Sequence, residues 1–345
     1  MRGKILPLSL LVSLCGAQAA ADDLPLFASD QPLDIVFEFP QDEIVRHADD
    51  RPVVEGRLQY ANERGEPVGI SLTMTTRGKS RLEYCRFPPL SINLQKQETR
   101  GTVFAGQKKL KLVTHCRSGS VQQRYLLQEY SIYRALNVLT DISFRVRYVH
   151  ATYRDSEGKR RDIVADGYFI ESDNELADRL DLQKQDVAIV HPSQLDPAHA
   201  IIMALFEFLI GNTDWSVIKG PGDEECCHNG KVVVPPGSDK GWYVVPYDFD
   251  QAGIINTRYS SPAPELGIHS VRQRLYRGRC MHLDRLDATI ALFNEHRGDI
   301  ETALLPSGLD ARTRNSAAKY IDDFYRIVND PVQRERYIEN RCLGG

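Results

Sequence analysis

Short runs of alternating hydrophobic and polar residues fill the chain from Leu33 to about Val113. They read LDIVFEF, VVEGRLQY, VGISLTMTT, LSINL and LKLV, and they are rich in β-branched and aromatic side chains. Turn-forming sequences such as Asn62-Glu63-Arg64-Gly65 and Ala105-Gly106 separate them. This spacing predicts a small antiparallel sheet.

The hydrophobic period lengthens beyond this region. Ser120 and Gln123 predict a capping box, and an apolar stripe at helical spacing runs from Val121 to Val138. Strand alternation returns in SFRVRYVHATYRD and DIVADGYFIE. After Ser172 the spacing is mostly helical, with a β-like stretch at 231–249. The expected helices there are 173–183, 197–210, 282–305 and 309–329.

This order predicts an α+β fold of two lobes. Residues 22–170 would form a β-rich N-terminal lobe with one inserted helix, and residues 171–345 a helix-rich C-terminal lobe. The crossover between them is expected near Gly167.

Residues 1–21 read as a signal peptide. Arg2 and Lys4 precede an apolar stretch, Ile5 to Leu14, that is too short to span a bilayer, and small residues at the cleavage positions follow it. Leu14 stands where a lipoprotein signal would need a small residue before Cys15. We therefore expect cleavage, export and a periplasmic or secreted protein. Later in the sequence no stretch is long and apolar enough for a transmembrane anchor.

Charge argues against nucleic acid as a partner. The formal net charge is −4, and loss of Arg2 and Lys4 with the signal would make the chain still more acidic. An acidic chain is a poor non-specific binder of a phosphate backbone. The oligomeric state has no signature in the sequence.

The cysteines predict disulfides, because an even number of them follows the signal peptide in a chain expected to be exported. The preferred pair is Cys85 with Cys116, since both flank β-like segments. Cys280 with Cys342 could tie down the C-terminal tail. Cys226-Cys227 lacks the spacing of a zinc site, and we expect these two to pair with other cysteines.

Three aspartates are candidates for chemistry. An apolar helical run ends at Gly211 and is followed by Asn212-Thr213-Asp214, which is either a plain helix stop with a turn or a loop that holds a carboxylate in a cleft. Asp248 and Asp250 follow the apolar strand Trp242 to Val245, and on an extended chain they project to the same side. Aspartates after a strand often only begin a turn. A same-side pair also suits magnesium, which prefers oxygen ligands, and we favour the metal.

A lysine and a glutamate add a second candidate pair. Lys111 alternates with Leu110 and Leu112 on a strand, and Glu129 lies within the apolar stripe of the following helix. A carboxylate there either reaches water at the edge of the stripe or needs a cation. A strand lysine paired with a glutamate of the next helix binds nucleotide phosphates in kinase folds, whereas a solvated lysine is the plainer alternative.

The order of these motifs resembles that of the spore-coat kinases (CotH-like), atypical kinases that phosphorylate protein serine, and most of all an exported bacterial branch of that family. The matching segments, between about residue 70 and residue 250, are TTRGKSR, FAGQKKLKLV, LLQEYSIYRAL, GYFIES, GNTDWSV, HNGK and VPYDFD. The resemblance implies an atypical protein-kinase-like fold of two lobes, with a β-rich N-lobe, one key helix and a helical C-lobe. Asn229 follows Asp214 at a greater distance than in ordinary protein kinases, where the corresponding asparagine comes within the catalytic loop.

The resemblance also implies roles for individual residues. Lys111, held by Glu129, would bind the phosphates of ATP, and Asp214 would orient or deprotonate the acceptor hydroxyl. The magnesium ligands and the residues around the nucleotide are implied in the same way. Asn229, Asp248 and Asp250 would hold Mg²⁺; Arg77, Lys79 and Arg81 would take the place of a glycine-rich phosphate loop, unless they form a basic surface turn; Phe169 and Glu171 would border the adenine.

The expected function is transfer of the ATP γ-phosphoryl group to a protein hydroxyl. Compartments outside the cytoplasm are poor in ATP, so two alternatives stand beside it: a silent pseudokinase that acts as a binding or scaffold module, and AMP transfer on the same scaffold. A hydrolase is disfavoured, because the sequence has no G-x-S-x-G elbow, no H-E-x-x-H pair and no Walker lysine.

Overall fold

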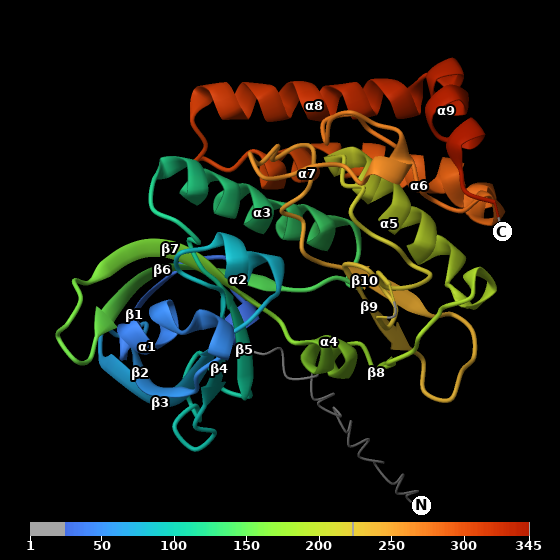
Figure 1. The fold of residues 1–345 in the computed structure, drawn as a ribbon. Coiled ribbons are helices and arrows are strands. Elements are labelled where there is room, and N and C mark those ends of the chain that lie inside the picture. Colours follow the sequence, from blue (N-terminus) through green and yellow to red (C-terminus); the bar gives the residue numbers. More distant parts are fainter. Residues whose placement is uncertain (1–24, 223, 345) are drawn as a thin grey trace, which may run out of the picture.

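Seven strands of the N-terminal half close into a barrel (Figure 1). The computed structural model describes residues 25–222 and 224–344, and the predicted signal peptide lies outside them. Around the barrel the strand order is β1-β2-β3-β4-β5-β7-β6. The barrel strands are β1 (Leu33–Phe39), β2 (Val54–Ala61), β3 (Pro67–Thr76), β4 (Leu90–Leu94), β5 (Lys109–Val113), β6 (Val146–Asp155) and β7 (Ile163–Ile170).

One parallel pair closes the barrel. Strand β1 pairs with β2 in antiparallel fashion and with β6 in parallel fashion, in a register that runs from Leu33 opposite Val149 to Phe39 opposite Asp155. The predicted antiparallel pairing of the strands between Leu33 and Val113 is confirmed, but the small open sheet is wrong, because β6 and β7 close these strands into a barrel. The predicted two-lobed kinase-like fold is also wrong, because a closed mixed barrel replaces its β-rich N-lobe.

Helix α3 (Ser120–Leu139) lies between the barrel and the C-terminal helices (Figure 1). It starts after Gly119, which supplies no side-chain cap, so the predicted capping box at Ser120 and Gln123 is not formed. The other helices are α1 (Gln41–Arg46), α2 (Ser80–Tyr84), α4 (Asp173–Arg179), α5 (Pro197–Ile210), α6 (Leu286–Glu295), α7 (Arg297–Leu304), α8 (Ala311–Asn329) and α9 (Pro331–Tyr337). A small sheet of β8 (Gln183–Lys184), β9 (Gly230–Val234) and β10 (Tyr243–Pro246) completes the fold.

Two hydrophobic cores result from strand alternation. Phe169 of β7 points into the barrel, where it packs against Phe37 and Phe104. Its neighbours Tyr168 and Ile170 belong instead to the core that α3 shares with the C-terminal helices. The outer face of the barrel thus forms part of the second core.

Three disulfides bridge the described cysteines. Cys85 pairs with Cys116 and Cys280 with Cys342, as predicted, whereas Cys226 and Cys227 pair with each other rather than with other cysteines. None of the helices formed by the described residues is long and apolar enough to cross a membrane. The disulfides are compatible with an exported protein.

Candidate functional site

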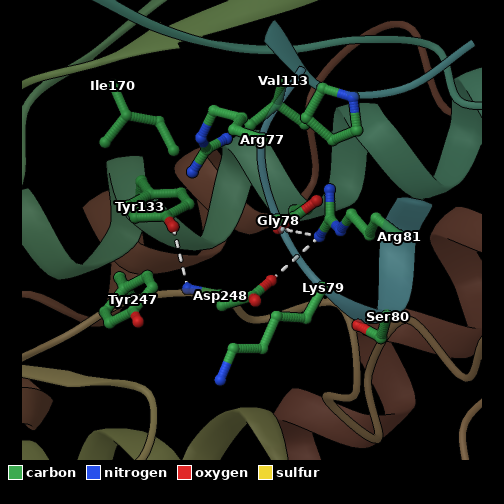
Figure 2. A pocket seen from close by; sticks show the side chains of 12 residues that line it. Arg77, Gly78, Lys79, Ser80, Arg81, Val113, Tyr133, Ile170, Tyr247 and Asp248 are labelled. Atoms are coloured by element: carbon green, nitrogen blue, oxygen red, sulfur yellow. Dashed lines mark hydrogen bonds and ion pairs between the residues drawn. The ribbon is translucent and has the colours of Figure 1, made fainter. Parts of the chain in front are cut away.

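A pocket opens where the segment after β3 faces the loop that follows β10 (Figure 2). Its free volume is about 50 Å³, much less than the roughly 300–1,000 Å³ of typical small-molecule sites. A nucleotide could enter only if the segment Arg77–Arg81 moved outward. The pocket is lined by Arg77, Gly78, Lys79, Ser80, Arg81, Pro89, Val113, Glu129, Tyr133, Ile170, Tyr247 and Asp248.

Three carboxylates converge on one nitrogen of Arg81. Its Nη2 lies 2.6 Å from Glu129, 3.0 Å from Asp248 and 3.3 Å from Asp250. Burial opposes the charge of Arg81, but Glu129, Asp250 and Asp248 together raise its pKa well above the ordinary value. The Arg81 side chain is 17% exposed and that of Glu129 only 5%. Glu129 therefore does not reach water at the edge of its helix; a cation pairs with it inside the protein.

The carboxylates outnumber the cation that binds them. Burial raises the pKa of Asp250 to about 7, and the charges of Asp248 and Glu129 add to the effect while Arg81 opposes it. Burial likewise raises the pKa of Glu129, against the attraction of Arg81. The cluster thus favours protons or further positive charge.

Backbone geometry places the two aspartates. Asp248 has a φ of 61°, in the left-handed region, and its N–H donates to the Tyr133 hydroxyl at 2.9 Å (Figure 2). Tyr259 donates its hydroxyl to Asp250 at 3.2 Å. Asparagine and aspartate tolerate a positive φ better than most residues, which suits the turn after β10 to an aspartate.

Lys111 binds Asp173 rather than Glu129. Its Nζ lies 2.5 Å from Asp173 Oδ1, at the start of α4. Burial would raise the pKa of Asp173, but the charge and hydrogen bond of Lys111 outweigh it and lower that pKa. Burial lowers the pKa of Lys111, with a contribution from the nearby charge of Arg77. The structure therefore brings Lys111 close to the basic segment but separates it from its predicted partner.

Arg77 and Lys79 both line the pocket. Burial lowers the pKa of Arg77, partly offset by the charge of Asp248. Lys79 is 77% exposed and lies 2.5 Å from Glu224. Together with Arg81 they line the same pocket, and their binding of phosphate stays a prediction.

Asp214 is fixed by residues that lie far from it in sequence. His228 Nε2 lies 2.7 Å from Asp214 Oδ1, and Asn229 Nδ2 donates to Asp214 Oδ2 at 3.0 Å. The hydrogen bond with Asp214 raises the pKa of His228, and the charge of Asp248 adds to it. Asp214 and Asn229 are therefore brought together, and the charge of Asp248 acts on His228 beside them.

The chain before Asp214 is rigid. Gly211 ends α5 with a φ of 67°, and a side chain there would overlap the Tyr320 hydroxyl. Asn212 Oδ1 accepts the N–H of Asp214 at 3.0 Å, and Arg277 donates to the carbonyls of Thr213 and Trp215. The same turn therefore both ends α5 and positions the Asp214 carboxylate.

Phe169 and Glu171 lie away from the pocket. Phe169 is fully buried in the barrel, and Glu171 is fully buried against Arg179, with bonds of 2.8 and 3.0 Å. Ile170, between them, is the residue of this strand that lines the pocket. The strand was predicted, but which of its two faces meets the pocket depends on a pairing that its own sequence does not specify.

The cluster around Arg81 suits magnesium in its chemistry. Carboxylate oxygens are the ligands that Mg²⁺ prefers, and Asn229 uses its amide nitrogen on Asp214, which leaves the amide oxygen as its potential ligand atom. Among the described residues, no three His, Cys, Asp or Glu side chains are arranged closely enough to hold a metal directly, and at this cluster the Arg81 guanidinium pairs with all three carboxylates.

Sequence reasoning missed the partners of these residues. Asp173 reads as part of a helix start, a role it also fills beside the capping residue Ser172. His228 and Arg277 had no signal that linked them to Asp214.

Comparisons with protein-family models, curated proteins and solved structures found no match for this chain. The resemblance to spore-coat kinases therefore rests on the motifs alone.

Proposed function

We propose that this chain is a phosphotransferase that moves the γ-phosphoryl group of ATP to a protein hydroxyl with magnesium. The observation that carries the proposal is the convergence of Glu129, Asp248 and Asp250 on Arg81, beside a basic segment. Such a cluster needs cations, and a basic segment needs anions; a magnesium-bound polyphosphate satisfies both.

The basic residues would bind the phosphates. Arg77 and Lys79 line the pocket, and Lys111 lies near Arg77. Magnesium, when bound, would neutralise phosphate charge next to Asp248 and Asp250. Arg81 would then be released from the carboxylates, and its guanidinium could bind phosphate oxygens in turn.

Asp214 would act on the acceptor. Its carboxylate would accept the hydroxyl proton as the acceptor oxygen bonds to the γ-phosphorus and the bond to the β-phosphate oxygen breaks. His228 and Asn229 would hold the carboxylate in position for this step. Most of the catalysis would come from positioning and charge neutralisation.

The order of the motifs supports this activity by its resemblance to spore-coat kinases, although the resemblance does not extend to the predicted fold. The signal-like N-terminus and the disulfides support action in the periplasm or outside the cell. ATP would have to reach that compartment.

A second function is favoured by the same geometry. Arg81 already neutralises part of the carboxylate cluster, and the pocket is nearly filled. A binding or scaffold module without turnover would need no more than this closed state.

Calorimetric titration with ATP, with and without MgCl₂, tests the proposal. Asp248→Asn keeps a side chain that tolerates the positive φ but removes the charge, and Asp239→Asn, on an exposed loop, is the matched control. We expect magnesium-dependent binding in the parent and in the control, and at least a tenfold loss in Asp248→Asn.

The products separate the remaining functions. After incubation with Mg-ATP and an added protein, mass spectrometry would show a phosphoryl group if the proposal holds and an adenylyl group for AMP transfer. Binding without any transfer would favour the binding module. No binding with magnesium or another divalent ion would overturn the nucleotide site.

A further inference from the structure

A second basic pocket lies at one end of the barrel, beside the Cys85–Cys116 disulfide. Its volume is about 440 Å³, far more than the candidate site offers. Four arginines from four separate segments line it, and Asp49 is the acidic residue among the described residues of its wall. The four are Arg46, Arg86, Arg117 and Arg160.

Two of these arginines share one carboxylate. Arg160 and Arg46 both pair with Asp42, Arg46 at 3.5 Å. A single carboxylate cannot neutralise two guanidinium groups. With Asp49 also in the wall, two carboxylates face these two arginines, so the net positive charge of the pocket comes from Arg86 and Arg117.

The other two arginines, Arg86 and Arg117, are not paired with a carboxylate among the described residues. Arg117 donates Nε to the Tyr84 carbonyl at 2.7 Å and stacks 4.1 Å from the centre of the Tyr84 ring, which orients its remaining nitrogens without pairing them with a carboxylate. Arg86 is exposed, and among the described residues nothing forms a hydrogen bond or ion pair with its side chain. Both guanidinium groups can therefore bind a ligand.

A buried histidine also lines the pocket. His115 is 5% exposed, its ring packs 4.9 Å from that of Phe87, and its Nδ1 has no hydrogen-bond partner among the described residues. Burial lowers the pKa of His115 to about 4, so the ring is neutral at ordinary pH. Because Nδ1 is shielded from solvent, the ring contributes a neutral wall to the pocket, and the arginines supply its charge.

We infer that this pocket binds a phosphate group, either inorganic phosphate or a phosphorylated side chain of a protein segment. Arginine forks match phosphate oxygens in geometry as well as charge. The volume exceeds what a bare phosphate fills, so the pocket also has room for the chain that carries one. The inference does not depend on the phosphotransferase activity, because none of these four arginines lines the candidate site.

Calorimetry on the disulfide-bonded chain tests the inference with three probes. They are a phosphoserine peptide with uncharged flanking residues, the same peptide without phosphate, and inorganic phosphate. We expect the phosphopeptide to bind at least tenfold more tightly than its unphosphorylated form. Inorganic phosphate that binds as tightly as the phosphopeptide would assign the pocket to the free ion, and weaker binding would assign it to a phosphorylated protein.

Variants locate the binding site. Arg86→Gln and Arg46→Gln each remove an exposed guanidinium, and we expect each to weaken binding about tenfold, as for loss of a hydrogen bond to a charged group. Arg312→Gln, exposed on α8, is the control and should leave binding unchanged, and Lys79→Gln, in the candidate site, tests whether the phosphate binds there instead.

Three results would overturn the inference: equal affinity for both peptides, unchanged affinity in both arginine variants, or loss of affinity in Lys79→Gln alone. The last result would place the phosphate in the candidate site instead. Failure of ATP to bind at the candidate site would leave the inference intact, so the two proposals can fail separately.

Discussion

Arg81 occupies the position at the candidate site that a bound metal ion would take, because one of its nitrogens pairs with three carboxylates and offsets part of their charge. Glu129 and Asp250 are largely buried, with side chains 5% and 13% exposed. Removal of one partner of a buried ion pair leaves an uncompensated charge, which costs more than the intact pair contributes. Arg81 should therefore stabilise the fold, in addition to its proposed role in binding phosphate.

Arg81→Gln should lower the free energy of unfolding by about 3 kcal/mol, in the range found for broken buried ion pairs. Urea unfolding at neutral pH measures this loss. Arg86→Gln, five residues away and exposed, is the control and should change stability by less than about 0.5 kcal/mol. Equal stability of the two variants would mean that the carboxylates find other cations or protons.

Glu207 is a second buried carboxyl group, on α5 behind Asp214. It is 1% exposed, and burial raises its pKa from 4.5 to about 8, with Asn212 opposing the shift. The folded state thus holds a proton that the unfolded state releases. Stability from this group is complete below the unfolded pKa and is lost as the pH rises through the folded pKa.

Glu207→Gln should remove that pH dependence, because a neutral side chain of the same shape has no proton to lose. Between pH 5 and pH 8 the variant should gain stability relative to the parent by about 1.4 kcal/mol per pH unit at most. Unfolding free energies measured across this range test the slope. Glu295→Gln, on an exposed face of α6, should follow the parent at every pH; a Glu207→Gln curve parallel to the parent would contradict the assignment.

At the scale of elements, the local sequence pattern predicted which side chains of a strand are buried better than it predicted which residues they contact. Alternation around Lys111 correctly separated it from the buried Leu110 and Leu112. Its partner, Asp173, comes from a helix that follows β7, and only the pairing of β5 with β7 brings the two together. No period within β5 carries that information.

Barrel closure is the clearest case of this limit. The alternation of β1 specifies which side chains point inward, but its parallel partner β6 begins more than a hundred residues later, at Val146. A meander of the intervening strands would satisfy the same alternation with two open edges. The pairing of β1 with β6 closes the sheet into a barrel. Because local alternation does not specify that long-range pair, the predicted fold was wrong.

At the scale of the whole molecule, α3 belongs to both halves. Tyr133 packs 5.9 Å from Tyr168 of the barrel and 4.8 Å from Phe249, which lies between Asp248 and Asp250 in the sequence. Gln128 reaches the Ile254 carbonyl, and Glu129 shares Arg81 with Asp248. The helix therefore couples the barrel to the loop that carries the chemistry.

The predicted boundary at residue 170 should consequently not separate two independent folding units. A fragment of residues 25–171, with Cys85–Cys116 oxidised, would keep α3 but expose the face that α5 and α7 cover, and would leave Glu129 and Arg81 without the aspartates. We expect it to bind the dye ANS and to show no cooperative thermal transition, as a molten globule does, whereas residues 25–345 should unfold cooperatively. A sharp transition and native-like near-ultraviolet circular dichroism in the fragment would contradict this, and would mean that the barrel core alone suffices to order α3. The candidate site could then be assembled from two parts that fold separately, and Arg81 would be free to leave the carboxylates without cost to the barrel.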